Sequence, residues 1–191
     1  MSHQKVYVFR HGETEWSLKS RHTGVTDLPL TEKGREKAKL IQPLLAKQTL
    51  ALVLTSPLQR ARQTCELAGV GEQAEVDTDL VEWNYGDYEG LTTEQIHAQN
   101  PGWFVFDSGS PGGETPEEVG KRVDRAITKI RAADGDVALF AHGHLLRVLV
   151  ARWLGLSASA GRHFDLDTAT LNILGYYHAV SAILTWNAPL C

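Results

Sequence analysis

The chain has 191 residues, a mass of 21.1 kDa and a formal net charge of -4 at pH 7. Its length fits one domain, and its 42% hydrophobic and 22% charged residues exclude a disordered, collagen-like or repeat protein. The negative charge provides no basic surface for nucleic acid, and no apolar run approaches the roughly 18 residues that span a bilayer.

The first half of the chain alternates between apolar runs and helix-forming segments. Residues 6–9 and 50–54 are short apolar runs, typical of strands buried on both faces of a sheet. A helix with a threonine cap is expected over residues 31–46. The Ser-Pro-Leu-Gln sequence around Pro57 resembles a capping box with proline at the first helical position, which predicts that a helix begins there.

A less regular stretch follows, and the alternation then resumes. Residues 83–113 are rich in glycine and proline, and we expect them to form a cap over the edge of the sheet, with one short helix at 93–99. The remaining expected elements are an amphipathic helix after a capping box at Thr115, a strand at 137–141, a helix at 144–154 and two strands at 171–177 and 182–186.

This alternation of strands and helices predicts an α/β fold with right-handed crossovers. We expect residues 1–191 to form a single-domain, three-layer sandwich, in which helices cover both faces of a mostly parallel sheet.

The N-terminal residues show no secretory signal, which predicts a cytoplasmic protein. Cys65 and Cys191 are too few for a disulfide scaffold, so we expect both thiols to be reduced.

Two of the predicted strands end in a His-Gly pair. His11 follows the first strand, and His142 follows the strand at 137–141. In open α/β sheets ligands bind beyond the carboxyl ends of the strands, so the two imidazoles are expected to share one crevice. An isolated histidine at such a place is more often structural, whereas the matched pair favours a functional site.

Two arginines are expected at the same crevice. Arg10 precedes His11, and Arg60 lies in the first turn of the helix predicted from Pro57. Guanidinium groups form planar, bidentate bonds to phosphate oxygens, and the free amides of a helix N-terminus add positive potential. The predicted ligand is therefore a phosphoryl group.

A histidine among arginines is a candidate nucleophile. Like charge disfavours the protonated ring, which leaves a ring nitrogen free to attack phosphorus. Transfer of a phosphoryl group to His11 also needs an acid that protonates the leaving alkoxide. Glu82, in a turn-rich segment after a short apolar run, is the candidate acid, although its spacing is equally compatible with a surface carboxylate.

Further blocks of sequence surround these residues. They are Arg10-His11-Gly12-Glu13-Thr14-Glu15-Trp16, Thr23-Gly24, Leu30-Thr31 with Gly34, Thr55-Ser56-Pro57 with Arg60-Ala61, Glu82, and His142-Gly143. In this order, and over nearly the whole chain, they resemble the successive signatures of the histidine phosphatase superfamily, the phosphoglycerate mutase-like proteins.

The resemblance implies a role for each matched residue. His11 would be the nucleophile that becomes phosphohistidine, Arg10, Arg60 and His142 would bind the phosphoryl oxygens, and Glu82 would donate the proton. It also implies a mixed sheet of about six strands, and neither a cofactor nor a metal. The further substrate-binding residues are expected to be Ser17, Thr23, Gly24, Tyr85, Gly143 and His144.

Within the superfamily the chain looks closest to the phosphatase branch, which includes sedoheptulose-bisphosphatase and small bacterial acid phosphatases. It has Ser17 where true mutases usually have asparagine, and His144-Leu145 where they have a polar Asn-Ser pair. Mutases also carry a paired-arginine segment in a longer cap, whereas residues 91–113 contain no arginine or lysine. We therefore predict hydrolysis of small phosphomonoesters, sugar phosphates among them, by a monomer or homodimer.

Three other interpretations stay open. The first is a cofactor-dependent phosphoglycerate mutase, which would use the same nucleophile and return the phosphoryl group to substrate. The second is a non-catalytic module that binds phosphorylated ligands, which would normally have lost His11 or Glu82. The third is a zinc site formed by His11, His142 and His144, which two neighbouring arginines disfavour by charge repulsion.

Aromatic residues in and near the cap are candidates for an apolar wall around the leaving group, although packing in the core explains them equally well. They are Trp16, Trp83, Trp103 and Phe104.

Overall fold

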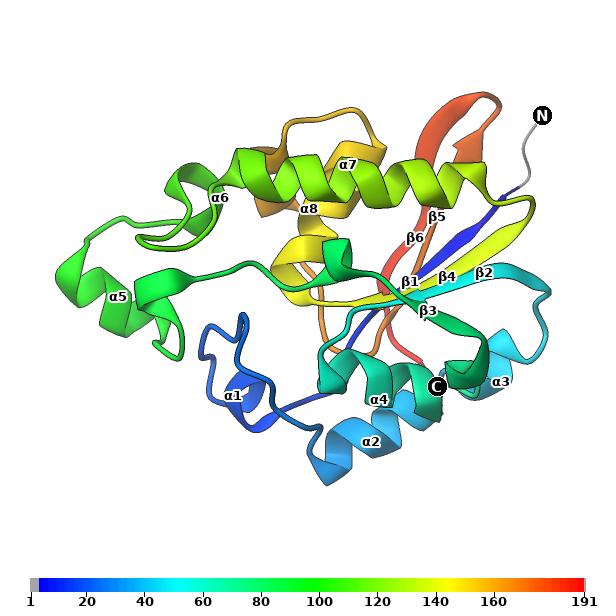
Figure 1. The fold of residues 1–191 in the computed structure, drawn as a ribbon, viewed down its shortest axis with the longest axis horizontal. Helices are drawn as coiled ribbons and strands as arrows, with labels where there is room; N and C mark the ends of the chain where they lie inside the picture. Colours follow the sequence, from blue (N-terminus) through cyan, green and yellow to red (C-terminus); the bar gives the residue numbers. More distant parts are fainter. Residues whose placement is uncertain (1–3, 191) are drawn as a thin grey trace.

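The computed structural model describes residues 4–190, so Cys191 lies outside the described residues, and Cys65 is a buried free thiol. Within the described residues, no helix combines the length and apolar character that a membrane span needs. Figure 1 shows the predicted three layers, with the sheet between two groups of helices. One face carries α7 (Pro116–Ala132) and α8 (Gly143–Trp153), and the other carries α2 (Glu32–Lys39), α3 (Gln42–Leu45) and α4 (Gln59–Leu67).

The described strands are β1 (Val6–Arg10), β2 (Leu50–Thr55), β3 (Ala74–Val76), β4 (Asp136–Ala141), β5 (Leu171–Tyr177) and β6 (Val180–Ala188). They form one sheet in the order β3-β2-β4-β1-β5-β6. The pairs β1–β4, β2–β4 and β2–β3 are parallel, while β1–β5 and β5–β6 are antiparallel. The prediction of a mostly parallel, six-stranded mixed sheet is thus confirmed.

Strand β1 contributes to a separate core on each face of the sheet. Val6 and Val8 pack in the cluster formed with α7 and α8, whereas Tyr7 and Phe9 pack in the cluster formed with the helices of the other face. All four side chains are buried. Burial of apolar surface contributes roughly 25 cal/mol per Å², so an entirely apolar strand is stabilised from both sides. This explains why the strand shows no polar alternation.

The single helix expected over residues 31–46 is wrong, because the structure has two helices there. Helix α2 ends at Lys39, and α3 begins at Gln42 with Pro43 in its first turn. Proline has no N–H to donate to the carbonyl four residues earlier, and its ring crowds that carbonyl, so the hydrogen-bond pattern is interrupted. Ile41 and Leu45 nevertheless remain buried against the sheet.

Helix α4 begins at Gln59, two residues later than expected, and Ser56 does not cap it. Instead, Oγ of Ser56 lies 2.7 Å from Nε2 of His142. The first N–H of the helix is donated to Oδ1 of Asp27, 32 positions earlier, at 2.8 Å. The helix that carries Arg60 is therefore anchored by a loop that is distant in the sequence.

Short helices lie mainly around the carboxyl edge of the sheet. The helix predicted at 93–99 is confirmed, and Figure 1 shows α5 and α6 extending beyond the sheet on the side where β1 and β4 end. The short helices are α1 (Glu15–Leu18), α5 (Thr93–Gln99), α6 (Val105–Ser108) and the 3-10 turns η1 (Gly71–Gln73), η2 (Thr78–Leu80), η3 (Gly86–Tyr88) and η4 (Ala158–His163).

The role of Asp27 as a distant helix cap predicts a stability effect. Asp27→Ala leaves an N–H at the start of α4 without its acceptor, and loss of a cap typically costs about 1 kcal/mol. We expect this decrease in the free energy of unfolding, measured by urea denaturation. Asp27→Asn, which retains an acceptor oxygen, and Glu36→Ala, on the exposed side of α2, should change it much less. Equal stability of Asp27→Ala and wild type would show that water replaces the cap at no cost.

Candidate active site

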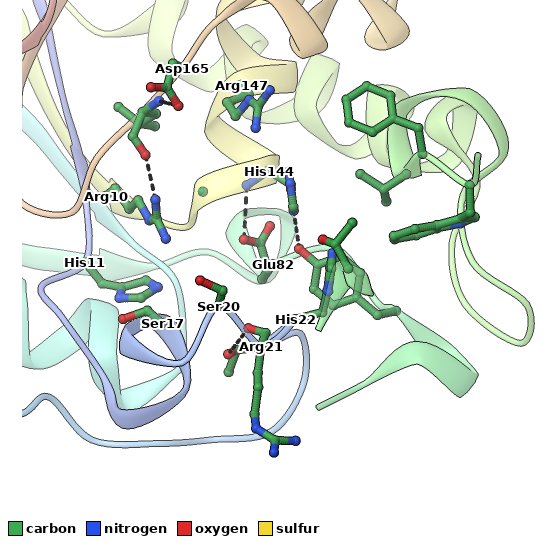
Figure 2. A pocket seen from close by; sticks show the side chains of 18 residues that line it. Arg10, His11, Ser17, Ser20, Arg21, His22, Glu82, His144, Arg147 and Asp165 are labelled. Carbon is green, nitrogen blue, oxygen red and sulfur yellow. Dashed lines mark hydrogen bonds between the residues drawn. The ribbon is translucent and has the colours of Figure 1, made fainter. Parts of the chain in front are cut away.

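A cavity of about 480 Å³ lies at the carboxyl ends of β1 and β4. Figure 2 shows that residues from the loop after β1, the segment around Glu82 and the start of α8 face one another across it. The structure thus brings together segments that are far apart in the sequence. Eight of the eleven predicted site residues line the cavity: Arg10, His11, Ser17, Thr23, Glu82, Tyr85, Gly143 and His144.

His11 lines the cavity with a neutral imidazole ring. Its Nδ1 lies 2.7 Å from the carbonyl oxygen of Gly12. Because a carbonyl only accepts, Nδ1 carries the proton and Nε2 keeps its lone pair. Burial, and then the positive charges of Arg60 and Arg10, hold the pKa of His11 well below its ordinary value of 6.5. The ring is therefore an unprotonated nucleophile at neutral and mildly acidic pH.

Arg10 has unused hydrogen-bonding capacity beside this ring. Its Nη1 donates to the carbonyl of Leu166 at 2.5 Å, but its buried Nε finds no acceptor among the described residues. A buried donor without a partner costs about 1–3 kcal/mol, which an anionic oxygen in the cavity would offset. Gly143 makes room for the guanidinium, since a Cβ there would lie 3.3 Å from Nε and Cζ of Arg10.

Glu82 is held between its own loop and the start of α8. Its Oε1 accepts the N–H groups of Trp83 and Leu145, both at 2.9 Å, and its Oε2 accepts the N–H of His144 at 3.1 Å. The side chain is buried but still reaches the cavity wall, as Figure 2 shows. Two of these amides belong to the first turn of α8, so this helix fixes the position of the carboxyl group.

Arg60 and His142 are fully buried behind the cavity wall. Nε of Arg60 donates to Nδ1 of His142 at 3.1 Å, while its Nη1 and Nη2 donate to three carbonyls of residues 23–26. The His142 ring lies 5.2 Å from the His11 ring, measured between centroids. Arg60 therefore connects the loop at 23–26 to the second histidine, and contact of either side chain with a phosphoryl group stays a prediction.

Gly24, the third predicted residue that does not line the cavity, is required by close packing. A Cβ at this position would lie 2.5 Å from the carbonyl oxygen of Trp83 and 2.6 Å from a carboxylate oxygen of Glu89. The Gly24 N–H is donated to the Glu89 carboxylate, and its carbonyl accepts from Arg60 at 2.8 Å. The glycine thus joins the first loop to the segment around Glu82.

The distal wall of the cavity, formed by His22, Tyr85, Trp103, Phe104 and His144, is aromatic and includes two neutral histidines. His22 packs edge-on against Tyr85 and Trp103, with centroid separations of 4.9 and 5.3 Å. The Tyr85 hydroxyl lies 2.5 Å from Nδ1 of His144. Burial lowers the pKa of both His22 and His144, and it raises that of Tyr85, so all three rings are uncharged at neutral pH. Phe104 and Arg147 also line this end.

Several lining residues were not predicted from the sequence. His22 and Arg21 adjoin the Thr23-Gly24 block, and this adjacency was the only available signal. Asp165 and Leu166 lie in a loop without a motif, and the Leu166 carbonyl accepts a hydrogen bond from Arg10. Of the aromatic candidates, Trp103 and Phe104 line the cavity, whereas Trp83 is core and Trp16 packs close to Gly90.

Residues 6–189 match the model of the histidine phosphatase superfamily, branch 1. The chain belongs to this superfamily. The predicted family and the predicted class of enzyme, a histidine phosphatase, are confirmed.

Individual relatives within the superfamily carry different names. An acid phosphatase from Mycobacterium tuberculosis is 40% identical over 92% of this chain and 88% of its own length. Sedoheptulose 1,7-bisphosphatase from Saccharomyces cerevisiae is 37% identical, covering 80% of this chain and 68% of its own. A probable phosphoglycerate mutase GpmB from Photorhabdus laumondii is 31% identical, covering 92% and 86%.

The solved structures agree with this assignment. The structure of an open reading frame product from Mycobacterium tuberculosis superposes with a TM-score of 0.92 and 37% identity, covering 98% of this chain and 99% of its own.

No group of three or more histidine, cysteine or acidic side chains within residues 4–190 is arranged to hold a metal ion. The alternative of a zinc site formed by His11, His142 and His144 therefore lacks its geometry.

The buried histidines predict how stability depends on pH. The pKa values of His11, His142 and His144 are all well below 6.5, mainly through burial. Below about pH 6.5 the unfolded chain thus binds more protons than the native state, and stability falls as the pH falls. Urea unfolding should show a loss of about 1 kcal/mol per histidine between pH 7.5 and 5.5.

The interval from pH 8.5 to 7.5 serves as the control, because neither state takes up histidine protons there. A free energy of unfolding that is equally high at pH 5.5 and 7.5 would mean that these rings are protonated in the native state.

Proposed function

We propose that this histidine phosphatase hydrolyses phosphomonoesters of small metabolites through a phosphohistidine on His11. The observation that carries the proposal is the neutral His11 ring, with Nε2 free, in the same cavity as the unpaired Nε of Arg10 and the fixed carboxyl of Glu82. These are a nucleophile, an anion-binding group and an acid that line one cavity.

The reaction follows in two steps. Nε2 of His11 attacks phosphorus, the bond to the leaving oxygen breaks, and the protonated Glu82 carboxyl gives its proton to that oxygen. Water then attacks the phosphohistidine while Glu82 takes up a proton, and phosphate leaves with His11 restored as a neutral ring. Arg10 binds the oxygens that carry developing charge, as predicted for Arg60 and His142 also.

The cavity supports a small substrate whose leaving group packs against rings. Its volume of about 480 Å³ limits the size of the ligand, and the distal wall offers Trp103, Phe104 and the neutral His22 and His144. Hydroxyl-bearing leaving groups suit the ring nitrogens, which accept or donate without charge. We therefore extend the proposal to sugar phosphates, a class that agrees with the sedoheptulose bisphosphatase among the relatives.

A second candidate, phosphoglycerate mutase activity, has one observation in its favour. Arg147 of α8 lines the cavity and supplies a cation that the cap itself lacks. However, its Nε and Nη2 already donate to the carbonyls of Gly161 and Arg162. Arg21 also lines the cavity, but its Nη1 donates to the carbonyl of Gly90. Guanidiniums constrained in this way form a weak clamp for a carboxylate that must be held through two phosphoryl exchanges, so hydrolysis is favoured.

The nucleophile is tested by trapping the covalent intermediate. A rapid acid-free quench with labelled phosphomonoester should give base-stable, acid-labile label on the wild-type enzyme, because phosphohistidine has this stability pattern. His11→Ala should carry no label and lose at least ~1,000-fold in activity, as expected when a nucleophile is removed. The control is His163→Ala, an exposed histidine of η4 outside the cavity, which should label normally. Comparable turnover by His11→Ala would refute the mechanism.

Hydrolysis and transfer are separated by a parallel assay. We expect phosphomonoester hydrolysis to exceed interconversion of 2- and 3-phosphoglycerate by more than ~100-fold, with or without 2,3-bisphosphoglycerate, since a mutase must exclude water from its phosphohistidine. Interconversion that depends on the bisphosphate and matches the hydrolytic rate would favour the mutase. Arg147→Gln should then abolish it.

A further inference from the structure

We infer that Arg122, a residue outside the cavity, is the positioning residue for the proton donor Glu82. The inference rests on the proposed function, in which Glu82 gives the proton to the leaving group. It concerns how a loop with little regular structure keeps a carboxyl group at one place.

Arg122 lies on α7 with only 8% of its surface exposed. Its Nη1 donates to the carbonyls of Asp79 and Val81 at 2.9 and 2.6 Å, and its Nη2 donates to the carbonyl of Glu82 at 3.2 Å. Its Nε and Nη2 also donate to the Glu114 carboxylate at 2.8 and 2.9 Å. These bonds use all five N–H groups of the guanidinium.

Glu114 extends the same arrangement to the residues after Glu82. Its Oε2 accepts the N–H of Asn84 at 2.9 Å, and its backbone carbonyl accepts Nε1 of Trp83, also at 2.9 Å. Its own N–H is donated to the carbonyl of Asn84. Arg122 and Glu114 together therefore hold the backbone on both sides of Glu82.

This clamp replaces the hydrogen bonds that regular structure would provide. The 3-10 turn η2 ends at Leu80 and η3 begins at Gly86, so the intervening segment belongs to neither a helix nor a strand. The start of α8 fixes the carboxyl end of the Glu82 side chain, and the guanidinium on α7 fixes its backbone. Only together do they determine where the proton is delivered.

Stability alone gives no reason for this ion pair, in which Arg122 is buried and Glu114 is partly buried. Replacing such a pair by packed apolar residues is often neutral or stabilising, because desolvation offsets the attraction. A planar group with five fixed donors does, however, impose a geometry that lysine or an apolar side chain does not reproduce. A misplacement of about 1 Å in a reacting group is enough to lower a rate roughly 100-fold.

The test compares kcat/KM for an alkyl phosphate, whose leaving group needs the proton, with that for 4-nitrophenyl phosphate, whose leaving group does not. We expect Arg122→Lys to lower the alkyl value by ~10- to 100-fold and the nitrophenyl value by less than ~3-fold. Glu114→Gln, which keeps the size of the side chain, should shift the same ratio to a smaller extent. Glu82→Gln sets the scale for complete loss of the acid.

The matched control is Arg125→Lys. Arg125 lies one turn further along α7 and binds the Asp79 carboxylate with two donors, but it makes no hydrogen bond or ion pair with Glu82 or Glu114. It should leave the ratio of the two kcat/KM values within ~2-fold of wild type, whatever its effect on the melting temperature.

The outcomes distinguish the inference from the proposal beneath it. If Glu82→Gln lowers both esters equally, Glu82 is not the acid and the proposed mechanism fails. If Glu82→Gln shifts the ratio while Arg122→Lys and Glu114→Gln behave like Arg125→Lys, the mechanism stands and Arg122 has no positioning role. Loss of the folded state in both Arg122→Lys and Glu114→Gln, seen by circular dichroism, would likewise overturn the inference by making the clamp purely structural.

Discussion

The site depends on one constraint, the parallel pairing of β1 with β4 in the register that sets Arg10 opposite Ala141. Because the two strands run in the same direction and end together, His11 and His142 leave the sheet at the same edge. A shift by one residue would turn Arg10 to the other face and separate the rings. The other contacts of the site depend on this register, among them the hydrogen bonds from Arg60 to His142 and from Arg10 to the Leu166 carbonyl.

Bringing these side chains together at one edge of the sheet lowers the free energy of unfolding. Two neutral imidazoles and two guanidiniums lie in or beside the wall of one cavity, and burial opposes the charged form of each. The apolar clusters on both faces of the sheet offset this cost, since β1 and β4 are buried along almost their entire length. The stable layers thus support a polar edge that could not fold alone.

The sequence predicted the parts of the molecule that local chemistry determines. Apolar runs located five of the six strands, and the capping box at Thr115 located the start of α7. It could not show β3, because three residues are too short for a periodic signal, nor the cap on α4, because Asp27 lies in a distant loop. The sequence also could not predict where the Arg60 side chain points. Its acceptors are backbone carbonyls of residues 23–26, and no pattern of residue types reveals a backbone acceptor.

The arginines around the site differ from several arginines elsewhere in the kind of hydrogen-bond acceptor that they bind. Around the cavity, the guanidiniums of Arg10, Arg21, Arg60 and Arg147 donate to backbone carbonyls. Elsewhere, Arg122, Arg125, Arg152 and Arg162 pair with carboxylates of Glu114, Asp79, Asp124 and Asp107. A carbonyl fixes a guanidinium without neutralising it, whereas a carboxylate cancels its charge. The carboxyl group of Glu82, the proposed acid, is in turn held by amides and not by an arginine. The guanidiniums around the cavity thereby keep their charge in a chain of net charge -4, and this charge favours the binding of a phosphoryl dianion.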